Sequence, residues 1–335
     1  MNRRQFIAGL GSTAAWPLAT RAQQPDRVRR IGVVMFGDES DPMTKARVSA
    51  FTQALADLGW TDGRNVRMDL RWGVGGADID RIRTLAQELV GLQPDIMVIN
   101  SVPATAAVQR ETRTIPIVFA NVGDPVGSGL VARLDRPSGN ITGFGDLGEA
   151  SLGGKRLELL SEVAPGLKRA AIMFNPNTTA ASLAASLYMP SLETAARTLK
   201  VALITAPVHS DAEIETAITT LAREPGGGLV VMPDAFTTVH RAPIISVAAR
   251  NNVPTVYALS EAARDGGLLS YGPDRTDNFR RAASYVDRIL RGEKPGDLPV
   301  QFPTKFEMVL NRKTATALGL AIPPSILLRA DEVIE

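Results

Sequence analysis

The sequence predicts an α/β protein made of two Rossmann-like lobes with parallel sheets. Short apolar runs alternate with longer segments of helical spacing, and this alternation starts again half-way along the chain. Runs rich in Val and Ile that are apolar throughout are typical of strands buried on both faces of a parallel sheet. With 335 residues, 44% of them hydrophobic and 21% charged, the chain is long enough for about two domains, each with a core of its own.

The apolar runs are expected to be strands, and the segments between them helices. The runs are 31–36, 66–72, 95–100, 115–121, 170–175, 201–207, 228–234, 253–259 and 267–272. In 43–59, Phe51 and Leu55 lie on one apolar stripe that ends before Gly59, and 79–92 has a similar stripe. Strand and helix in regular alternation predict a parallel sheet.

The second half of the chain repeats the plan of the first. A strand at 95–100, a helix and a strand at 115–120 resemble the series 228–234, helix, 253–258. The later strand of each series opens with a β-branched residue and a proline. We interpret each series as the third strand, helix and fourth strand of a lobe; one long sheet with a chance resemblance is the alternative. The segment 122–150 is rich in Gly, Pro, Asp and Asn and is expected to cross between the lobes with little regular structure.

Residues 1–22 are predicted to be an export signal rather than part of the fold. Arg3 and Arg4 precede Phe6-Ile7 and an apolar stretch, and Thr20-Arg21-Ala22 supplies small residues where a signal peptidase cleaves. The paired arginines resemble a twin-arginine signal. A membrane-anchoring helix is the alternative, but the stretch is broken by Gly and Pro and falls short of the ~20 residues of a spanning helix. Cleavage would remove three arginines from a chain of formal charge +2 and leave −1.

Composition excludes several kinds of site. The chain has no cysteine and two histidines, so thiolate chemistry and a His-rich metal centre are ruled out. His209 and His240 stand far apart without a ligand-spaced partner and are expected at the surface. The G-x-G-x-x-A pattern at 9–14 lies in the export signal with no strand before it and is not a nucleotide site. No cofactor, metal or catalytic set is expected, and no basic run favours nucleic acid.

Polar side chains follow the predicted strands, and this is where a parallel α/β sheet binds ligands. The candidate ligand-binding residues in the first half are Phe36, Asp38, Glu39, Ser101, Val102, Pro103, Thr105, Asn121 and Asp124. Those in the second half are Asn175, Asn177, Asp234, Tyr257 and Tyr271. Because strand ends converge at one edge, we expect these groups to line one cleft.

Each candidate also has a purely structural interpretation. Ser101, with Pro103 in the first turn after it, can cap a helix whose free N–H groups form a carboxylate seat, or it is a plain cap. Asp38, Glu39, Asp124 and Asp234 can hold an ammonium group, or cap helices. Tyr271 can stack on a ligand or fill the lobe interface.

Several of these segments resemble one family. They are IGVVMFGDESDP (31–42), TIPIVFANVGDPVGSGL (114–130), SGNITGF (138–144), LSYGPD (269–274), PTKFEMVLN (303–311), IPPS (322–325) and RADEVIE (329–335). Together they are similar to the ABC-transporter substrate-binding family that includes tryptophan and tyrosine binders. The resemblance covers nearly the whole chain after the export signal.

The resemblance implies a type I periplasmic binding fold with three crossings between lobes. In such folds one late strand and helix return to the first lobe, and 267–292 followed by 300–310 fits that order. The expected division is 1–22 signal, 29–145 plus 266–293 lobe 1, and 146–265 plus 294–335 lobe 2.

The function implied is capture of a small solute between the lobes and delivery to an ABC permease. The ligand, an amino acid or small aromatic carboxylate by resemblance, favours closure because it contacts both lobes only in the closed form. The protein is expected to be a periplasmic monomer that is not an enzyme and is not inserted in the membrane after cleavage. Two alternatives stay open: a secreted α/β enzyme that uses strand-end carboxylates, and a sensor that presents its ligand to a membrane receptor.

Overall fold

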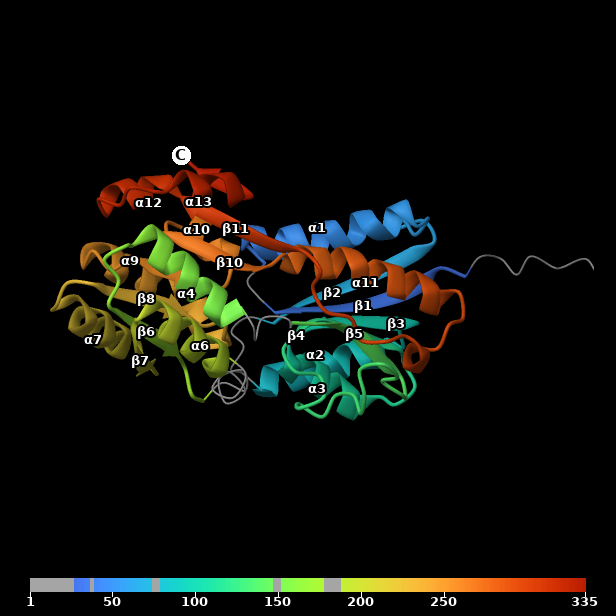
Figure 1. Cartoon of the computed structure of the whole chain (residues 1–335). Coiled ribbons are helices and arrows are strands. Elements are labelled where there is room, and N and C mark those ends of the chain that lie inside the picture. Colours follow the sequence, from blue (N-terminus) through green and yellow to red (C-terminus); the bar gives the residue numbers. More distant parts are fainter. Residues whose placement is uncertain (1–26, 37–38, 74–78, 147–151, 178–187) are drawn as a thin grey trace, which may run out of the picture.

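The chain forms two α/β lobes side by side, each built around its own sheet (Figure 1). The computed structural model describes residues 27–36, 39–73, 79–146, 152–177 and 188–335. The predicted export signal at 1–22 lies outside the described residues. No helix in the described ranges has both the length and the apolar character needed to cross a membrane.

Lobe 1 holds a five-stranded parallel sheet in the order β2-β1-β3-β4-β5. Its strands are β1 (Arg29–Phe36), β2 (Val66–Gly73), β3 (Ile96–Asn100), β4 (Ile117–Val122) and β5 (Ile141–Gly145). Its helices are α1 (Pro42–Asp57), α2 (Ile79–Gly91), α3 (Val102–Glu111) and, from late in the chain, α11 (Arg275–Leu290). In Figure 1, α1 and α11 cover one face of this sheet and α2 and α3 cover the other.

Lobe 2 holds a seven-stranded sheet in the order β12-β11-β10-β9-β8-β6-β7. The strands are β6 (Arg169–Phe174), β7 (Ala202–Pro207), β8 (Gly227–Val231), β9 (Thr255–Tyr257), β10 (Leu269–Pro273), β11 (Phe306–Asn311) and β12 (Glu332–Ile334). The helices are α4 (Leu152–Val163), α6 (Met189–Leu199), α7 (Asp211–Ala222), α8 (Ala235–Val239), α9 (Arg241–Arg250), α10 (Ser260–Arg264), α12 (Arg312–Ala317) and α13 (Pro324–Arg329). A short 3-10 turn, η2, spans Pro295–Asp297. All pairs are parallel except β10 with β11.

The predicted repeat is present in the strand order. Counted from its own first strand, each lobe runs second, first, third, fourth, fifth: β2-β1-β3-β4-β5 and β7-β6-β8-β9-β10. The series at 95–120 and 228–258 are therefore the third and fourth strands of the two lobes, as predicted. In this order the first and third strands are neighbours, which places a ligand-binding crevice at their carboxyl ends.

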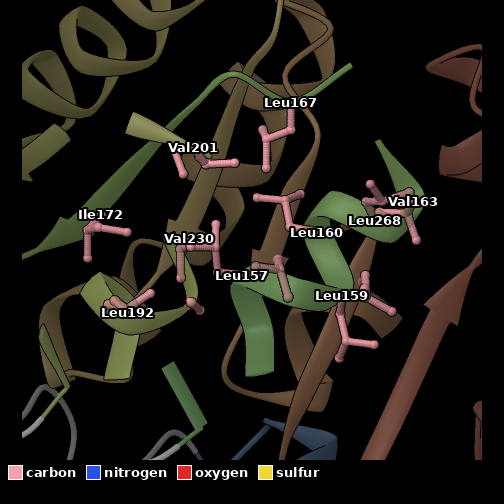
Figure 2. Packing of buried hydrophobic residues seen from close by; sticks show 14 of the residues in the cluster. Leu157, Leu159, Leu160, Val163, Leu167, Ile172, Leu192, Val201, Val230 and Leu268 are labelled. Carbon is pink, nitrogen blue, oxygen red and sulfur yellow. The ribbon is translucent and has the colours of Figure 1, made fainter. Parts of the chain in front are cut away.

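Alternate strand residues feed two cores in each lobe. In β3, Ile96 and Val98 join the cluster under α1 and α11, whereas Met97 and Ile99 join the cluster on the other face. In lobe 2, Leu157 and Leu160 of α4 share a cluster with Val230 of β8, as Figure 2 shows. Because β3 and β8 are buried on both faces, their sequences are apolar almost throughout rather than alternating.

The chain crosses between the lobes three times. The first crossing follows Asp146, the second joins β10 to α11, and the third runs from Phe302 to β11. Val300 and Gln301 still belong to lobe 1, where their backbone N–H groups donate to Leu134 O and Gly143 O at 2.7 and 3.0 Å. The three predicted crossings are confirmed.

Two sequence-based predictions about these crossings are wrong. The segment 122–150 was expected to be irregular, but it contains β5, a fully buried fifth strand. Two glycines in Ile141–Gly145 weaken the strand signal, and packing requires one of them: a Cβ on Gly143 would lie 2.1 Å from the Phe119 carbonyl oxygen.

The second correction concerns the predicted return of 266–293 to lobe 1. Only α11 returns, because β10 pairs with β9 and β11 in the second sheet. β10 continues the lobe 2 order as its fifth strand, just as β5 does in lobe 1. The segment from 294 through Gln301 was predicted to belong to lobe 2. Its end at Val300 and Gln301 instead joins lobe 1, where Gln301 pairs with β5.

Candidate functional site

A cavity lies between the two lobes at the carboxyl ends of their strands. Lobe 1 contributes Asp41 and Arg47 of α1 and its N-cap, together with Arg275 at the start of α11. Lobe 2 contributes the segments after β8 and β9, two threonines of α8, and residues of α9 and α10; these are Val231, Met232, Pro233, Thr237, Thr238, Arg241, Tyr257, Ala258, Leu259, Glu261 and Ala262. The wall is thus mostly lobe 2, with charged side chains added by lobe 1.

The cavity is small in this arrangement of the lobes, at about 70 Å³. Small-molecule sites usually exceed about 300 Å³, so a solute enters only when the lobes or the lining side chains move apart. A larger hollow of about 680 Å³ lies between α4 and α6 on the outer side of lobe 2. We take the smaller cavity as the site because both lobes line it and strand ends surround it, whereas the α4–α6 hollow is an open groove of one lobe.

Asp41 caps helix α1 and is held on lobe 1. Its carboxylate accepts the backbone N–H groups of Met43 and Thr44 at 3.4 and 3.2 Å, and the Thr44 hydroxyl at 2.7 Å. Burial alone would raise the Asp41 pKa, but these hydrogen bonds and the nearby Arg241 outweigh it and lower the pKa. Asp41 is therefore a fixed negative charge at the cavity.

Arg47 and Glu261 form an ion pair from α1 to α10, between the lobes. Only 12% and 11% of these two side chains is exposed. Burial opposes ionisation of Glu261, but Arg47, helped by Arg275 and Arg264, lowers its pKa below the ordinary value. Glu261 is therefore ionised at neutral pH and faces the Arg47 guanidinium.

A polar cluster joins the first and second crossings beside the cavity. The Arg275 guanidinium lies 3.2 Å from the Asp146 carboxylate. Asn278 Nδ2 donates to Asn121 Oδ1 at 2.8 Å and to Asp146 Oδ1 at 3.3 Å. Burial raises the pKa of Asp146, against the opposing charges of Arg275 and Arg47. Asn121 also donates to the Arg275 carbonyl at 3.2 Å, so this candidate side chain is hydrogen-bonded within the cluster at the crossings.

The predicted site residues after β1 are only partly described. Phe36 ends β1 and nothing is described of its side chain, Asp38 lies outside the described residues, and Glu39 is exposed in a turn. The candidate after β4, Asp124, accepts the N–H groups of Val126 and Gly127 at 3.1 and 2.8 Å, so its carboxylate caps a turn.

The predicted group after β3 forms the start of α3. Ser101 Oγ accepts the Ala104 N–H at 3.4 Å, with φ of 80° at Ser101 itself. Val102 is half-buried and Pro103 exposed, while Thr105 is fully buried and donates to the Ser101 carbonyl at 2.7 Å. Ser101 is thus a helix cap, and its use as a carboxylate seat stays a prediction.

The lobe 2 candidates divide into cavity and scaffold positions. Tyr257 is buried at the cavity wall, and burial raises the pKa of its hydroxyl. Asp234 caps α8 in a capping box with Thr237 and also accepts the Asn175 N–H at 3.0 Å. Burial raises the pKa of Asp234, partly offset by these hydrogen bonds.

The remaining two candidates in lobe 2 lie away from the cavity wall. Asn177 is exposed, and its backbone N–H donates to Asn175 Oδ1 at 2.8 Å. The Tyr271 ring stacks on Phe306 with centroids 6.5 Å apart and packs against the α4 core of lobe 2. Of the predicted side chains in the described ranges, Tyr257 is the one that lines the cavity.

Sequence reasoning missed the charged side chains of the cavity. Arg47 and Glu261 lie within helices, and Arg241 opens α9. Charged residues at helical positions usually form a solvated face. Glu261 lies in the first turn of α10 directly after β9, and that place could have found it, because such turns face the crevice. Arg47 lies further along α1 and Arg241 opens the second helix after β8, so they carry no such signal.

The sequence match to a protein family identifies the class of protein that contains this two-lobe cavity. Residues 30–334 match the family of ABC transporter substrate binding proteins. The chain belongs to this family. A tyrosine-binding protein of Clostridioides difficile is 26% identical over 283 residues, which cover 84% of this chain and 79% of that protein.

Several solved structures share the fold. A conserved domain protein from Vibrio cholerae aligns with a TM-score of 0.79 and 27% identity over 92% of this chain and all of that one. An ABC domain from Streptococcus pneumonia in complex with L-Trp aligns with a TM-score of 0.80 and 25% identity, covering 91% and 99% of the two chains.

A ligand-free, open structure gives a useful contrast. It is a substrate binding protein with adhesive properties from Clostridium difficile, 24% identical, covering 92% of this chain and 99% of that one, with a TM-score of 0.71. At nearly equal identity, the present substrate-binding protein therefore aligns better with the L-Trp complex than with the open form.

Proposed function

We propose that this substrate-binding protein captures an amino acid or small aromatic carboxylate in the inter-lobe cavity and delivers it, unaltered, to an ABC permease. The observation that carries the proposal is a cavity whose wall needs both lobes: Asp41, Arg47 and Arg275 from one, Tyr257 and Glu261 from the other. A ligand that contacts both walls is bound better when the lobes are together, so it favours closure.

The chemistry of the wall supports a zwitterionic or carboxylate ligand. Three arginines and two acids surround a space that also contains an aromatic ring and apolar residues such as Met232 and Leu259. Arginine binds a carboxylate, a carboxylate binds an ammonium group, and the apolar surface receives a side chain. The relatives named for tyrosine and L-Trp support an aromatic amino acid as the ligand.

The test is ligand-dependent stabilisation of the mature chain. L-Trp, L-Tyr, other amino acids and aromatic acids are screened by thermal shift, and a ligand at ~100 times its Kd adds about 2.7 kcal/mol to the free energy of unfolding. Mass spectrometry of the recovered compound must show it unchanged. A chemically converted compound would favour a secreted enzyme, and no stabilisation by any compound would contradict solute capture.

We also propose export to the periplasm by the twin-arginine route, as the Arg3-Arg4-Gln5-Phe6-Ile7 sequence supports. Lysine in place of both arginines should leave the precursor in the cytoplasm, as measured by cell fractionation. Normal export of that variant would indicate the general secretion route.

A further inference from the structure

Facing charges on the two lobes alternate in sign along one side of the cavity. Lobe 1 presents Asp41 and then Arg47 from the N-terminal part of α1. Lobe 2 presents Arg241 and Glu261 to the same cavity. The Arg241 charge lowers the Asp41 pKa, and Arg47 is ion-paired with Glu261. Each negative group therefore has a positive group of the other lobe as its neighbour.

The Arg47–Glu261 contact differs from the other ion pairs. Among ion pairs between described residues, the remainder lie within one lobe or between crossing segments, as Lys305 with Asp274 does. Many are also well exposed, such as Arg133 with Asp135 at 71% and 64% of the side chains, whereas Arg47 and Glu261 are close to 90% buried. A buried pair is screened less by salt and is costly to leave half-paired.

Asp41 and Arg241 are anchored on their own lobes, and the residue one helical turn after Glu261 is anchored on lobe 2. Asp41 caps α1, and Arg241 is bound to Asp265 at 2.6 Å on lobe 2. Next to Glu261, Arg264 is held by Ser260 Oγ at 2.9 Å and by Glu332 of the C-terminal strand at 2.8 Å, and its guanidinium lies 3.8 Å from Met43 Sδ of lobe 1. Because these side chains cannot follow one another when the lobes separate, the contacts break on opening and form again on closing.

We propose that Arg47–Glu261, supported by Asp41–Arg241, is an inter-lobe latch that sets the balance between open and closed forms before ligand binds. Arg47 and Glu261 also line the cavity, so their effect on the lobes is measured first in the free protein, where no ligand contact contributes. The inference rests on the proposed function only where ligand affinity is the readout. Apparent affinity falls by the fraction of molecules that leave the binding-competent form.

The decisive experiment measures lobe separation without ligand. The chain has no cysteine, so spin labels can be placed at Arg110→Cys on α3 and Glu193→Cys on α6, both exposed positions in different lobes. Arg47→Glu and Glu261→Arg should each shift the label distance distribution of the free protein toward longer distances. The double charge exchange, which restores opposite signs, should return it toward that of the wild type.

Controls separate the latch from general damage. Exchange of the exposed pair Arg133 and Asp135, which lies within lobe 1 with 71% and 64% of the side chains exposed, should leave the distances unchanged. Glu261→Gln is the milder variant in case a reversed charge prevents folding, and it should also lengthen the distances. Unchanged distances in folded Glu261→Gln and in the single reversals, or a folded double exchange that stays as open as they are, would overturn the latch.

Ligand affinity gives the second readout, with L-Trp as the probe. Arg47→Glu should weaken its Kd by about fivefold or more, and the double exchange should recover to within about twofold of the wild type. If L-Trp fails to bind the wild type, L-Trp is not the ligand, while the ligand-free distances still decide the latch.

Discussion

Lobe 1 and lobe 2 share a strand order but not an edge. In lobe 1 the sheet ends at β5, whose free side is met by the third crossing through the Phe144–Gln301 bridge. In lobe 2 the fifth strand β10 is followed outward by β11 and β12, with β11 antiparallel to β10. The C-terminal part of the chain therefore covers the free edge of the fifth strand in both lobes, by a single bridge in lobe 1 and by two added strands in lobe 2.

The two lobes also contribute differently to the cavity. Lobe 2 provides most of the surface, from loops fixed by the α8 capping box and by the buried ring of Tyr257. Lobe 1 provides three charged side chains. Every lobe 1 group at the wall is charged, whereas lobe 2 combines Arg241 and Glu261 with apolar and hydroxyl side chains, so the two lobes can be perturbed separately.

The largest expected effects come from the two separate cores. Phe279→Ala in lobe 1 should cost about 3–5 kcal/mol and Leu160→Ala in lobe 2 about 2–5 kcal/mol, since these side chains are 1% and 0% exposed. The described tryptophans, Trp60 and Trp72, both lie in lobe 1. In urea, Leu160→Ala should shift the circular dichroism transition more than the tryptophan fluorescence transition. Equal shifts in both probes would show that the lobes unfold as one unit.

The fifth strands offer a matched pair of glycines. A Cβ on Gly143 would lie 2.1 Å from Phe119 O, and one on Gly272 would lie 1.9 Å from Ala258 O. Alanine at either position should cost about 1–3 kcal/mol through overpacking, measured by urea unfolding. Gly91→Ala, where no atom lies within 4 Å, is the control and should not destabilise. If alanine is tolerated at only one of the two positions, the two fifth strands are not packed alike.

The caps after the third strands should differ between the lobes. The Asp234 carboxylate accepts the Thr237 N–H at 2.8 Å and the Asp234 N–H donates in return to Thr237 Oγ1, whereas Ser101 caps α3 at 3.4 Å. Asp234→Ala should therefore cost near the upper end of the ~0.5–2 kcal/mol range for a lost cap, and Ser101→Ala near the lower end. Thermal unfolding measures both. The reverse order would show that Ser101 has a role beyond capping.

Glu261 at the cavity and Asp146 in the polar cluster beside it should respond to pH with opposite signs. The pKa of Glu261 in the folded protein is below its ordinary 4.5, so its stabilisation is present above that pH and is lost as the pH falls. The pKa of Asp146 is raised above its ordinary 3.8, so its charging destabilises the fold as the pH rises through that window.

Variants of these two carboxylates make the difference in sign measurable. Glu261→Gln should lose more stability relative to wild type at about pH 6 than at about pH 3, and Asp146→Asn should gain relative to wild type over the same rise. Urea unfolding at several pH values measures both. Parallel slopes for the two variants would contradict the assignment.

Most of the fold could be predicted from sequence, because buried parallel strands leave a local signal. Runs such as 31–36 and 95–100 are apolar throughout, and the Ile115-Pro116 and Val253-Pro254 openings marked the fourth strands. The fifth strand at 141–145 was missed because its two glycines weaken the strand pattern. Gly143 is required there by its close contact with Phe119. The strand at 269–273 was placed in the wrong lobe because nothing in its own residues specifies its neighbours.

The amino-acid sequence by itself determined the α/β class, the doubled order of elements and the family of this substrate-binding protein. Periodicity and strand composition are local properties that burial imposes on each segment. Only the tertiary structure decided that β10 extends lobe 2, that Asp234 and Asp124 cap local turns, and that Arg47 meets Glu261 across the cavity. The Arg47–Glu261 contact joins residues 214 positions apart, and its energy depends on distance and burial, which no local pattern encodes.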